Sequence, residues 1–243
     1  MNKLFLLGLV AVSVNAFAQM DPNASATSKA YAAYRVYDTT PPYGLAKVKT
    51  LIKTAKHKDI AEGDTYLVAL TDSQFNSLSF EEKYTYVMIH PEQFQQNCDG
   101  PFLKNGEEKM VFPYLPSSST EMGLSDRETQ FLKNNKSKVV ELMKEEIGRV
   151  QHVGLNIKQA VLDLDAYSLI PSLVSAFERN KKDLDILTVL VNLMKDGHYK
   201  PFEASETYTK LFGPNASYDS YIVGNAANQK LTTDRAMAFY KSM

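Results

Sequence analysis

The chain has 243 residues, of which 44% are hydrophobic and 23% are charged, and its formal net charge is −1. This composition excludes a mainly disordered chain and a strongly basic nucleic-acid-binding protein. The single cysteine excludes an intramolecular disulfide framework and a structural zinc knuckle. A chain of this length folds as one large domain or as two small ones.

The N-terminus has the three parts of a secretory signal peptide. Lys3 supplies the positive charge, Leu4–Val14 is an uncharged run of 11 residues, and positions 16–18 read Ala-Phe-Ala, the small-x-small pattern of a cleavage site. The run is shorter than the roughly 20 residues of a membrane span, and no later run is long enough. We therefore expect cleavage after Ala18, removal of residues 1–18, and export of a mature chain without a transmembrane segment to the periplasm or the cell exterior.

Apolar periodicity along the rest of the chain predicts a mainly α fold, an antiparallel array of helices joined by short connections. Glu82 and Glu128 each follow a serine by three residues, which is capping-box spacing, so helices should begin at Ser79 and Ser125. Pro171 should kink the helix in which it lies. The ranges that we expect to be helical are 44–57, 80–90, 125–148, 156–179, 183–196, 202–212, 218–229 and 233–243.

The C-terminal half contains the most apolar of these segments. Residues 183–196 are apolar on nearly all sides, so their helix should lie at the centre of that half. After it come Asp-Gly-His-Tyr at 196–199, Tyr-x-Lys-Leu-Phe at 208–212 and Pro-Asn at 214–215. Together these resemble one tetratricopeptide unit of about thirty residues, although no second copy is visible. The resemblance implies that helix pairs in this half stack into a binding surface.

Two segments are candidates for β-structure. Residues 65–70 form a short apolar run that periodicity cannot assign to a strand or a helix. Within 103–113, the turn sequence Lys-Asn-Gly-Glu suggests a short strand or a hairpin. Because long irregular segments often mark boundaries, the Pro- and Gly-rich stretch 97–124 divides the chain. The expected parts are an N-terminal helical region at 19–112, a Pro/Ser-rich linker or loop at 113–124 and a C-terminal helical region at 125–243.

Four residues could carry chemistry. Glu82, Tyr86 and His90 recur at steps of four, so they lie along one line of a helix, and all three residue types transfer protons. Cys98 follows, and a Cys–His pair with a carboxylate could act as a nucleophile or hold a metal. The alternative, which we favour, is an ordinary capped helix in which Cys98 is a small buried residue. His90 would then cap the helix C-terminus, where the helix dipole should raise its pKa.

Two surface patterns have both a functional and a structural interpretation. Tyr31, Tyr34 and Tyr37 recur at steps of three, so they could stack on sugars or bases or form an interface. We expect instead that they dock an N-terminal helix onto the domain. A cluster of basic residues could bind a polyanion or an anionic lipid surface, although we expect a solvated helix face. Its members are Lys47, Lys49, Lys53, Lys56, His57 and Lys58.

Several familiar motifs do not occur, among them a Gly-rich phosphate loop, the Gly-x-Ser-x-Gly elbow, His-Glu-x-x-His and an EF-hand loop. Asp163 and Asp165 have a paired-carboxylate spacing, but residues two apart on a helix point to different faces. We therefore expect no cofactor, no metal and no nucleic acid. Neither the ligand nor the oligomeric state follows from the sequence.

The leading hypothesis is an exported helical binding or scaffold protein that presents a groove to a protein or polymer partner, and an enzyme is the less favoured class. The enzymatic alternative is a small exported hydrolase that uses His90 with Glu82, Tyr86 or Cys98. A further alternative is a polyanion-binding surface on the Lys47–Lys58 helix. An enzyme requires His90 to open into a pocket beside a partner, whereas a scaffold requires a concave apolar patch.

Overall fold

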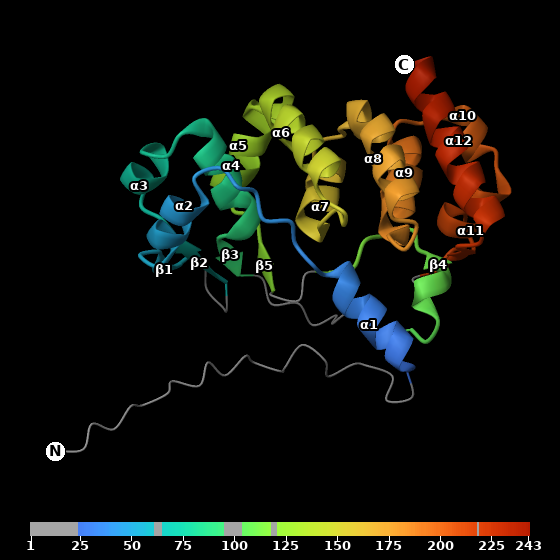
Figure 1. Cartoon of the computed structure of the whole chain (residues 1–243), viewed down its shortest axis with the longest axis horizontal. Coiled ribbons are helices and arrows are strands. Elements are labelled where there is room, and N and C mark those ends of the chain that lie inside the picture. Colours follow the sequence, from blue (N-terminus) through green and yellow to red (C-terminus); the bar gives the residue numbers. More distant parts are fainter. Residues whose placement is uncertain (1–23, 61–64, 95–103, 118–120, 218) are drawn as a thin grey trace.

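The computed structural model describes residues 24–60, 65–94, 104–117, 121–217 and 219–243. Most helices stand side by side in a row that runs from α3 at one end to α12 at the other, with the strands and α1 along one side of the row (Figure 1). The predicted mainly α fold is therefore confirmed. Among the helices of the described residues, none is long and apolar enough to cross a membrane.

The N-terminal part of the described chain contains four helices, of which α2, α3 and α4 belong to the row (Figure 1). Their bounds are α1 Ala26–Arg35, α2 Leu45–Ile52, α3 Asp72–Asn76 and α4 Phe80–Ile89. The predicted capping box of α4 is confirmed, because the Ser79 side chain accepts from the backbone of Glu82 and the Glu82 carboxylate accepts from the Ser79 backbone. The prediction that the helix from residue 44 continues to 57 is wrong. Backbone turn bonds from Thr54 and Ala55 end it, and the chain enters a strand.

An antiparallel sheet of four short strands lies beside α4. Its order is β1-β2-β3-β5, with bounds β1 Lys56–Asp59, β2 Tyr66–Ala69, β3 Gln93–Phe94 and β5 Met122–Gly123. The apolar run that periodicity could not assign is thus a strand. The rings of Tyr66 and Phe94 stack across β2 and β3 with centroids 4.6 Å apart. The sheet is completed by residues distant in sequence, which local patterns do not reveal.

Of the short strand or hairpin expected within 103–113, the part of the segment that the structure describes contains a short strand and no hairpin. The turn at Lys104–Glu107 leads instead into a 3₁₀ helix, η2 Glu107–Lys109, and then into β4 Met110–Val111. The partner of β4 is β6 Ile222–Val223, near the other end of the chain. Partners so far apart give no local hairpin signal. The predicted helix over 218–229 is wrong in its first half, where β6 lies, whereas residues 226–229 are helical.

The middle of the row contains helices that the sequence pattern merged. Their bounds are α5 Asp126–Asn134, α6 Lys136–Arg149, α7 Leu155–Asp163, η3 Tyr167–Leu169 and α8 Ile170–Arg179. The expected helix over 125–148 is two helices, broken at Asn135, whose side chain donates to the Phe131 carbonyl. Pro171 does not kink a helix. It lies in the first turn of α8, where its missing N–H is not needed.

The C-terminal part is built around one buried helix. Every residue of α9 Leu184–Asp196 from Leu184 to Met194 is buried, which confirms its predicted central place. The remaining helices are α10 Lys200–Glu203, α11 Glu206–Phe212 and α12 Ala226–Ser242. The expected helix over 202–212 is therefore two, and the expected helix from 233 begins earlier. One continuous apolar core runs through the row and includes side chains from both sides of 113–124.

Candidate functional site

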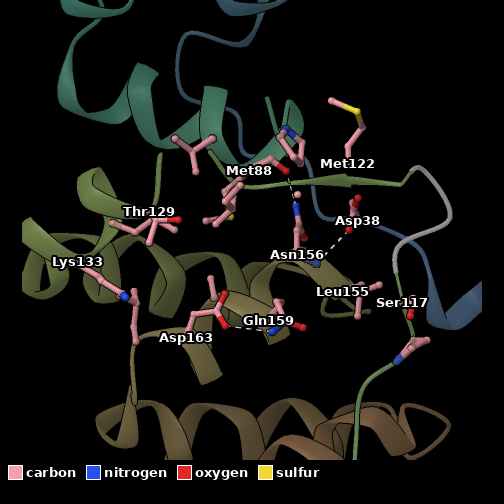
Figure 2. A pocket seen from close by; sticks show the side chains of 18 residues that line it. Asp38, Met88, Ser117, Met122, Thr129, Lys133, Leu155, Asn156, Gln159 and Asp163 are labelled. Carbon is pink, nitrogen blue, oxygen red and sulfur yellow. Dashed lines mark hydrogen bonds between the residues drawn. The ribbon is translucent and has the colours of Figure 1, made fainter. Parts of the chain in front are cut away.

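A pocket of about 480 Å³ opens in the middle of the row, between α4, α5 and α7, with β5 and Pro116–Ser117 closing one side (Figure 2). We call it the central pocket. Its floor is apolar and consists of buried side chains from three helices. These are Val87 and Met88 of α4, Leu132 of α5, and Leu155, Ala160 and Leu164 of α7 and its C-terminal cap. Its rim is polar, and its charged residues are Asp38, Lys133 and Asp163.

Helix α7 lines the central pocket with two adjacent rows of residues. Leu155, Gln159 and Asp163 follow one another at steps of four, and the line Asn156, Ala160 and Leu164 runs beside it. Steps of four place side chains on one face of a helix, so α7 turns a continuous strip toward the pocket. The strip is apolar in the floor and polar at the rim.

The segment after α1 fixes the rim near the start of α7. The Asp38 carboxylate accepts from the Asn156 backbone at 3.0 Å, and the Asn156 amide donates to the Met88 carbonyl at 2.8 Å (Figure 2). The same amide donates to the Thr39 carbonyl at 2.8 Å. Gly154 packs so closely on Thr39 that any Cβ there would collide with its backbone. Asp38 thus has a fixed position and remains exposed. Loss of water in the recess raises its pKa.

The rim at the C-terminal end of α7 carries charges of both signs. The Asp163 carboxylate accepts from the Gln159 side chain at 3.1 Å (Figure 2). Loss of water raises the Asp163 pKa, while the Gln159 hydrogen bond and the nearby Lys133 ammonium act in the opposite direction. The two carboxylates and one ammonium give the charged rim a formal sum of −1. An apolar floor with a few fixed polar groups is the usual form of a ligand site.

A second recess, which we call the aromatic cleft, lies between α1 and the α6–α7 connection. Tyr34, Tyr37, Arg149 and His152 line it, together with Ala33. The His152 ring stacks on Tyr34 with centroids 3.7 Å apart and on Tyr37 at 5.4 Å. Burial and the nearby Lys158 ammonium lower the His152 pKa to about 4, so the imidazole is neutral at pH 7. The prediction that the tyrosine stripe docks α1 holds for Tyr31, which is buried in the core, and for Tyr34, which packs against it, whereas Tyr37 stays 55% exposed.

Beneath α1, buried charges tie the helix to the core. Arg35 donates from Nε and Nη2 to Asp185 at 2.8–3.1 Å and from Nη1 to Glu107 at 3.1 Å. Beside them, Lys158 Nζ donates to Asp183 at 2.5 Å. Burial raises the pKa of Glu107 to about 7 and that of Asp183 to about 6, against the effect of their cationic partners. We call these five side chains the Arg35 cluster, in which each carboxylate pairs with a cation of the same chain.

A second buried group joins the sheet to α5. The Glu92 carboxylate accepts from Tyr86 at 2.6 Å, from Ser125 at 2.7 Å and from Arg127. The Glu128 carboxylate accepts from the backbones of Glu92 and Ser125 at 3.0 and 2.9 Å, which includes the predicted capping box. Burial and the adjacent Glu92 charge raise the Glu128 pKa to about 8. We call these residues the Glu92 cluster.

The residues predicted from sequence to carry proton chemistry face different partners. Glu82 forms an ion pair with Lys47 at 2.7 Å, while Tyr86 donates to Glu92. His90 Nε2 lies 2.8 Å from the Val68 carbonyl, to which it donates, and its ring centroid is 5.3 Å from that of Tyr86. Cys98 lies outside the described residues, so its pairing with His90 stays a prediction.

The expected direction of the His90 pKa is wrong. His90 is the C-cap residue of α4, but its ring packs against β2 and away from the helix end. Burial lowers its pKa, and the Val68 hydrogen bond opposes that shift only in part. A helix dipole raises the pKa of a histidine whose ring lies beside the last helical carbonyls, and the His90 ring lies against Val68 instead. Tertiary packing on a strand that the sequence did not define reversed the sign.

The lysine cluster is exposed, as a solvated face would be. Lys47 and Lys49 lie on α2, Lys56 and Lys58 on β1, and Lys53 on the turn between them. The predicted single helical face is therefore a helix followed by an edge strand. Charged residues on an edge strand also hinder its pairing with other chains. The cluster contributes no residue to either of the two recesses.

The pocket residues that sequence reasoning missed are Asp38, Asn156 and Gln159, and Asp163 was noted only for its pairing with Asp165. The steps of four from Leu155 to Asp163 were a usable signal for one face of α7. No signal placed Asp38 beside α7, because that contact joins segments more than a hundred residues apart. Among the described residues, no group of three His, Cys, Asp or Glu side chains is arranged to hold a metal ion. Comparisons with protein-family models, curated proteins and solved structures gave no significant match.

Proposed function

We propose that this protein is a binding module that receives apolar side chains of a partner protein segment in the central pocket. The observation that carries the proposal is the combination of a buried apolar floor and an exposed polar rim in one recess. Apolar groups that enter such a recess leave water at about 25 cal/mol per Å². The fixed rim groups would then orient the segment.

Binding suits this recess better than catalysis does. Its described lining contains neither histidine nor cysteine, and its hydroxyls are those of Ser117 and Thr129. A nucleophile needs an adjacent base within hydrogen-bond reach. The two rim carboxylates accept hydrogen bonds from Asn156 and Gln159 instead. The volume of about 480 Å³ falls in the range of about 300–1,000 Å³ that ligand pockets occupy.

Selection from a random peptide library displayed on phage tests the proposal even though the partner is unidentified. The wild-type protein is one bait, and Ala160→Phe is a second in which a benzyl group fills the floor. Ala33→Phe is the matched control, because it makes the same substitution on a helix that lines the aromatic cleft. Thermal melting of each bait shows that it is folded.

We expect wild type and Ala33→Phe to enrich peptides with clustered apolar residues, and Ala160→Phe to lose that enrichment. Absence of enrichment on the wild-type protein would contradict the proposed function. Loss of enrichment on Ala33→Phe alone would move the binding site to the aromatic cleft and would also contradict it.

We also propose that the protein acts outside the cytoplasm, supported by Lys3, the run Leu4–Val14 and the Ala-Phe-Ala sequence at 16–18. Intact-mass measurement of the protein from its native host should give a chain that begins at Gln19. Retention of Met1 in exported material would rule out this cleavage.

A further inference from the structure

The charges on the rim of the central pocket are distributed unevenly. Lys133 and Asp163 lie toward one side of the pocket, whereas Asp38 lies on the other (Figure 2). The Lys133 ammonium acts on Asp163 and partly offsets its charge. Asp38 receives a backbone N–H from Asn156, and no cationic side chain in the described ranges forms an ion pair with it. The Asp38 side of the rim is therefore the electronegative side.

Asp38 is also placed to meet a ligand. It is exposed, and the hydrogen bond with Asn156 and the packing of Thr39 on Gly154 hold its backbone in place. That hydrogen bond uses one carboxylate oxygen, Oδ1, which leaves the second oxygen with acceptor capacity. A fixed carboxylate beside an apolar floor complements a group that is apolar along its length and cationic at its end.

We propose that the partner segment carries a lysine or arginine next to its apolar residues, and that this cation pairs with Asp38 while the apolar residues fill the floor. The inference rests on the proposed function and adds the charge of the partner. Lysine and arginine suit this position because their methylene stems pack on apolar surface while the charged head stays at the rim. A free small amine is the rival source of the same chemistry.

Peptides selected on the wild-type protein provide the test. We expect a lysine or arginine at a constant spacing from the apolar residues in the enriched sequences. A double-mutant cycle then measures the coupling between Asp38 and the basic residue of one such peptide. Wild type and Asp38→Asn are each titrated with that peptide and with an analogue that has norleucine in place of the basic residue. Asparagine keeps an acceptor for the Asn156 backbone and removes only the charge. Asp38→Ser serves the same purpose if Asp38→Asn does not fold.

We expect Asp38→Asn to weaken binding of the basic peptide about two- to fivefold, the upper part of the range for an exposed charge pair, and that of the norleucine analogue less than about twofold. Asp163→Asn is the matched control, because Lys133 already offsets its charge, and should weaken the basic peptide less than about twofold. Lys133→Gln should leave binding equal or tighten it.

The possible failures are distinguishable. If no peptide is selected, the proposed function itself is contradicted. Three results would overturn the inference about charge and leave the proposed function standing: selection of apolar peptides without a basic residue, equal loss for both peptides in Asp38→Asn, or a larger effect of Asp163→Asn. Binding of octylammonium at an affinity equal to that of the basic peptide would assign the site to a small amine and would also overturn it.

Discussion

Two sets of carboxylates in this protein share a raised pKa but differ in access. Glu107, Asp183 and Glu128 are buried and fully enclosed by protein. Asp38 and Asp163 have lost only part of their water, in a recess that is open to solvent. In both sets the cause of the shift is desolvation, which disfavours the charged form.

The difference lies in what completes each group's interactions. Glu107 and Asp183 pair with arginine and lysine side chains of their own chain and are buried, so a ligand in solution does not reach them. Asp38 accepts a backbone N–H on one oxygen and stays exposed in the lining of the central pocket. A raised pKa alone therefore does not identify a binding residue, and the access of the group decides. Four predictions can break or sharpen this comparison.

Removal of the central cation beneath α1 should have the largest effect. Arg35→Met leaves Asp185 and Glu107 buried without their partner, so we expect the free energy of unfolding to fall by about 3–5 kcal/mol. Lys133→Met at the pocket rim should change it by less than about 0.5 kcal/mol. Denaturant midpoints of the two variants measure the contrast, and similar losses would show that the two regions do not differ as described.

Truncation of an apolar side chain in the core gives a reference value for the loss of stability in Arg35→Met. Leu190 is fully buried in α9, and Leu190→Ala should lower the free energy of unfolding by about 2–5 kcal/mol through lost burial and a residual cavity. Lys53 is exposed on the turn after α2, so Lys53→Ala should cost less than about 0.5 kcal/mol. Urea titrations that ranked the two variants in the reverse order would contradict this assignment of the core.

The Glu92 cluster should make stability depend on pH. The folded pKa of Glu128 is about 8, above its usual 4.5, so the folded state holds a proton that the unfolded state releases between these values. The free energy of unfolding should therefore decline as pH rises from about 4.5 to 8. Glu128→Gln keeps a neutral acceptor and should flatten the decline, whereas the exposed control Glu141→Gln should not. An unchanged slope in Glu128→Gln would exclude this role.

His90 should show the smallest effect and a different pH range. Its hydrogen bond to Val68 should be worth about 0.5–1.5 kcal/mol, which His90→Gln loses at neutral pH. Because burial lowers the folded pKa, this stabilisation is complete above the unfolded pKa of about 6.5 and falls as pH drops below it. Melting temperatures across this range should converge on the acidic side. Melting temperatures that diverge on the acidic side would restore the interpretation that His90 caps the C-terminus of α4 with a raised pKa.

The sequence predicted those elements whose signals are local. The α9 helix followed from a segment that is apolar on nearly all sides, and the starts of α4 and α5 followed from the capping boxes at Ser79 and Ser125. Elements set by distant partners were missed, as β4 and β6 show. The prediction that Pro171 kinks a helix was wrong, because proline is common in the first turn of a helix as well as at breaks.

The candidate site was less predictable than the fold. Its α7 strip could be derived from steps of four, but the side of the rim that carries Asp38 comes from a segment before α2. His90 and Glu82 attracted attention because of residue type and spacing, and their partners turned out to be a strand carbonyl and a surface lysine. Residue chemistry suggests candidates, whereas tertiary contacts decide which of them remain accessible.

Amide hydrogen exchange with and without a peptide selected on the wild-type protein tests the central claim most directly. We expect the peptide to slow exchange in α7 and in residues 122–133, which contribute walls of the central pocket. Exchange in α1 and α9, which enclose the Arg35 cluster, should stay unchanged. Protection confined to α1 and the residues around His152, with none in α7, would contradict the assignment of the central pocket as the binding site.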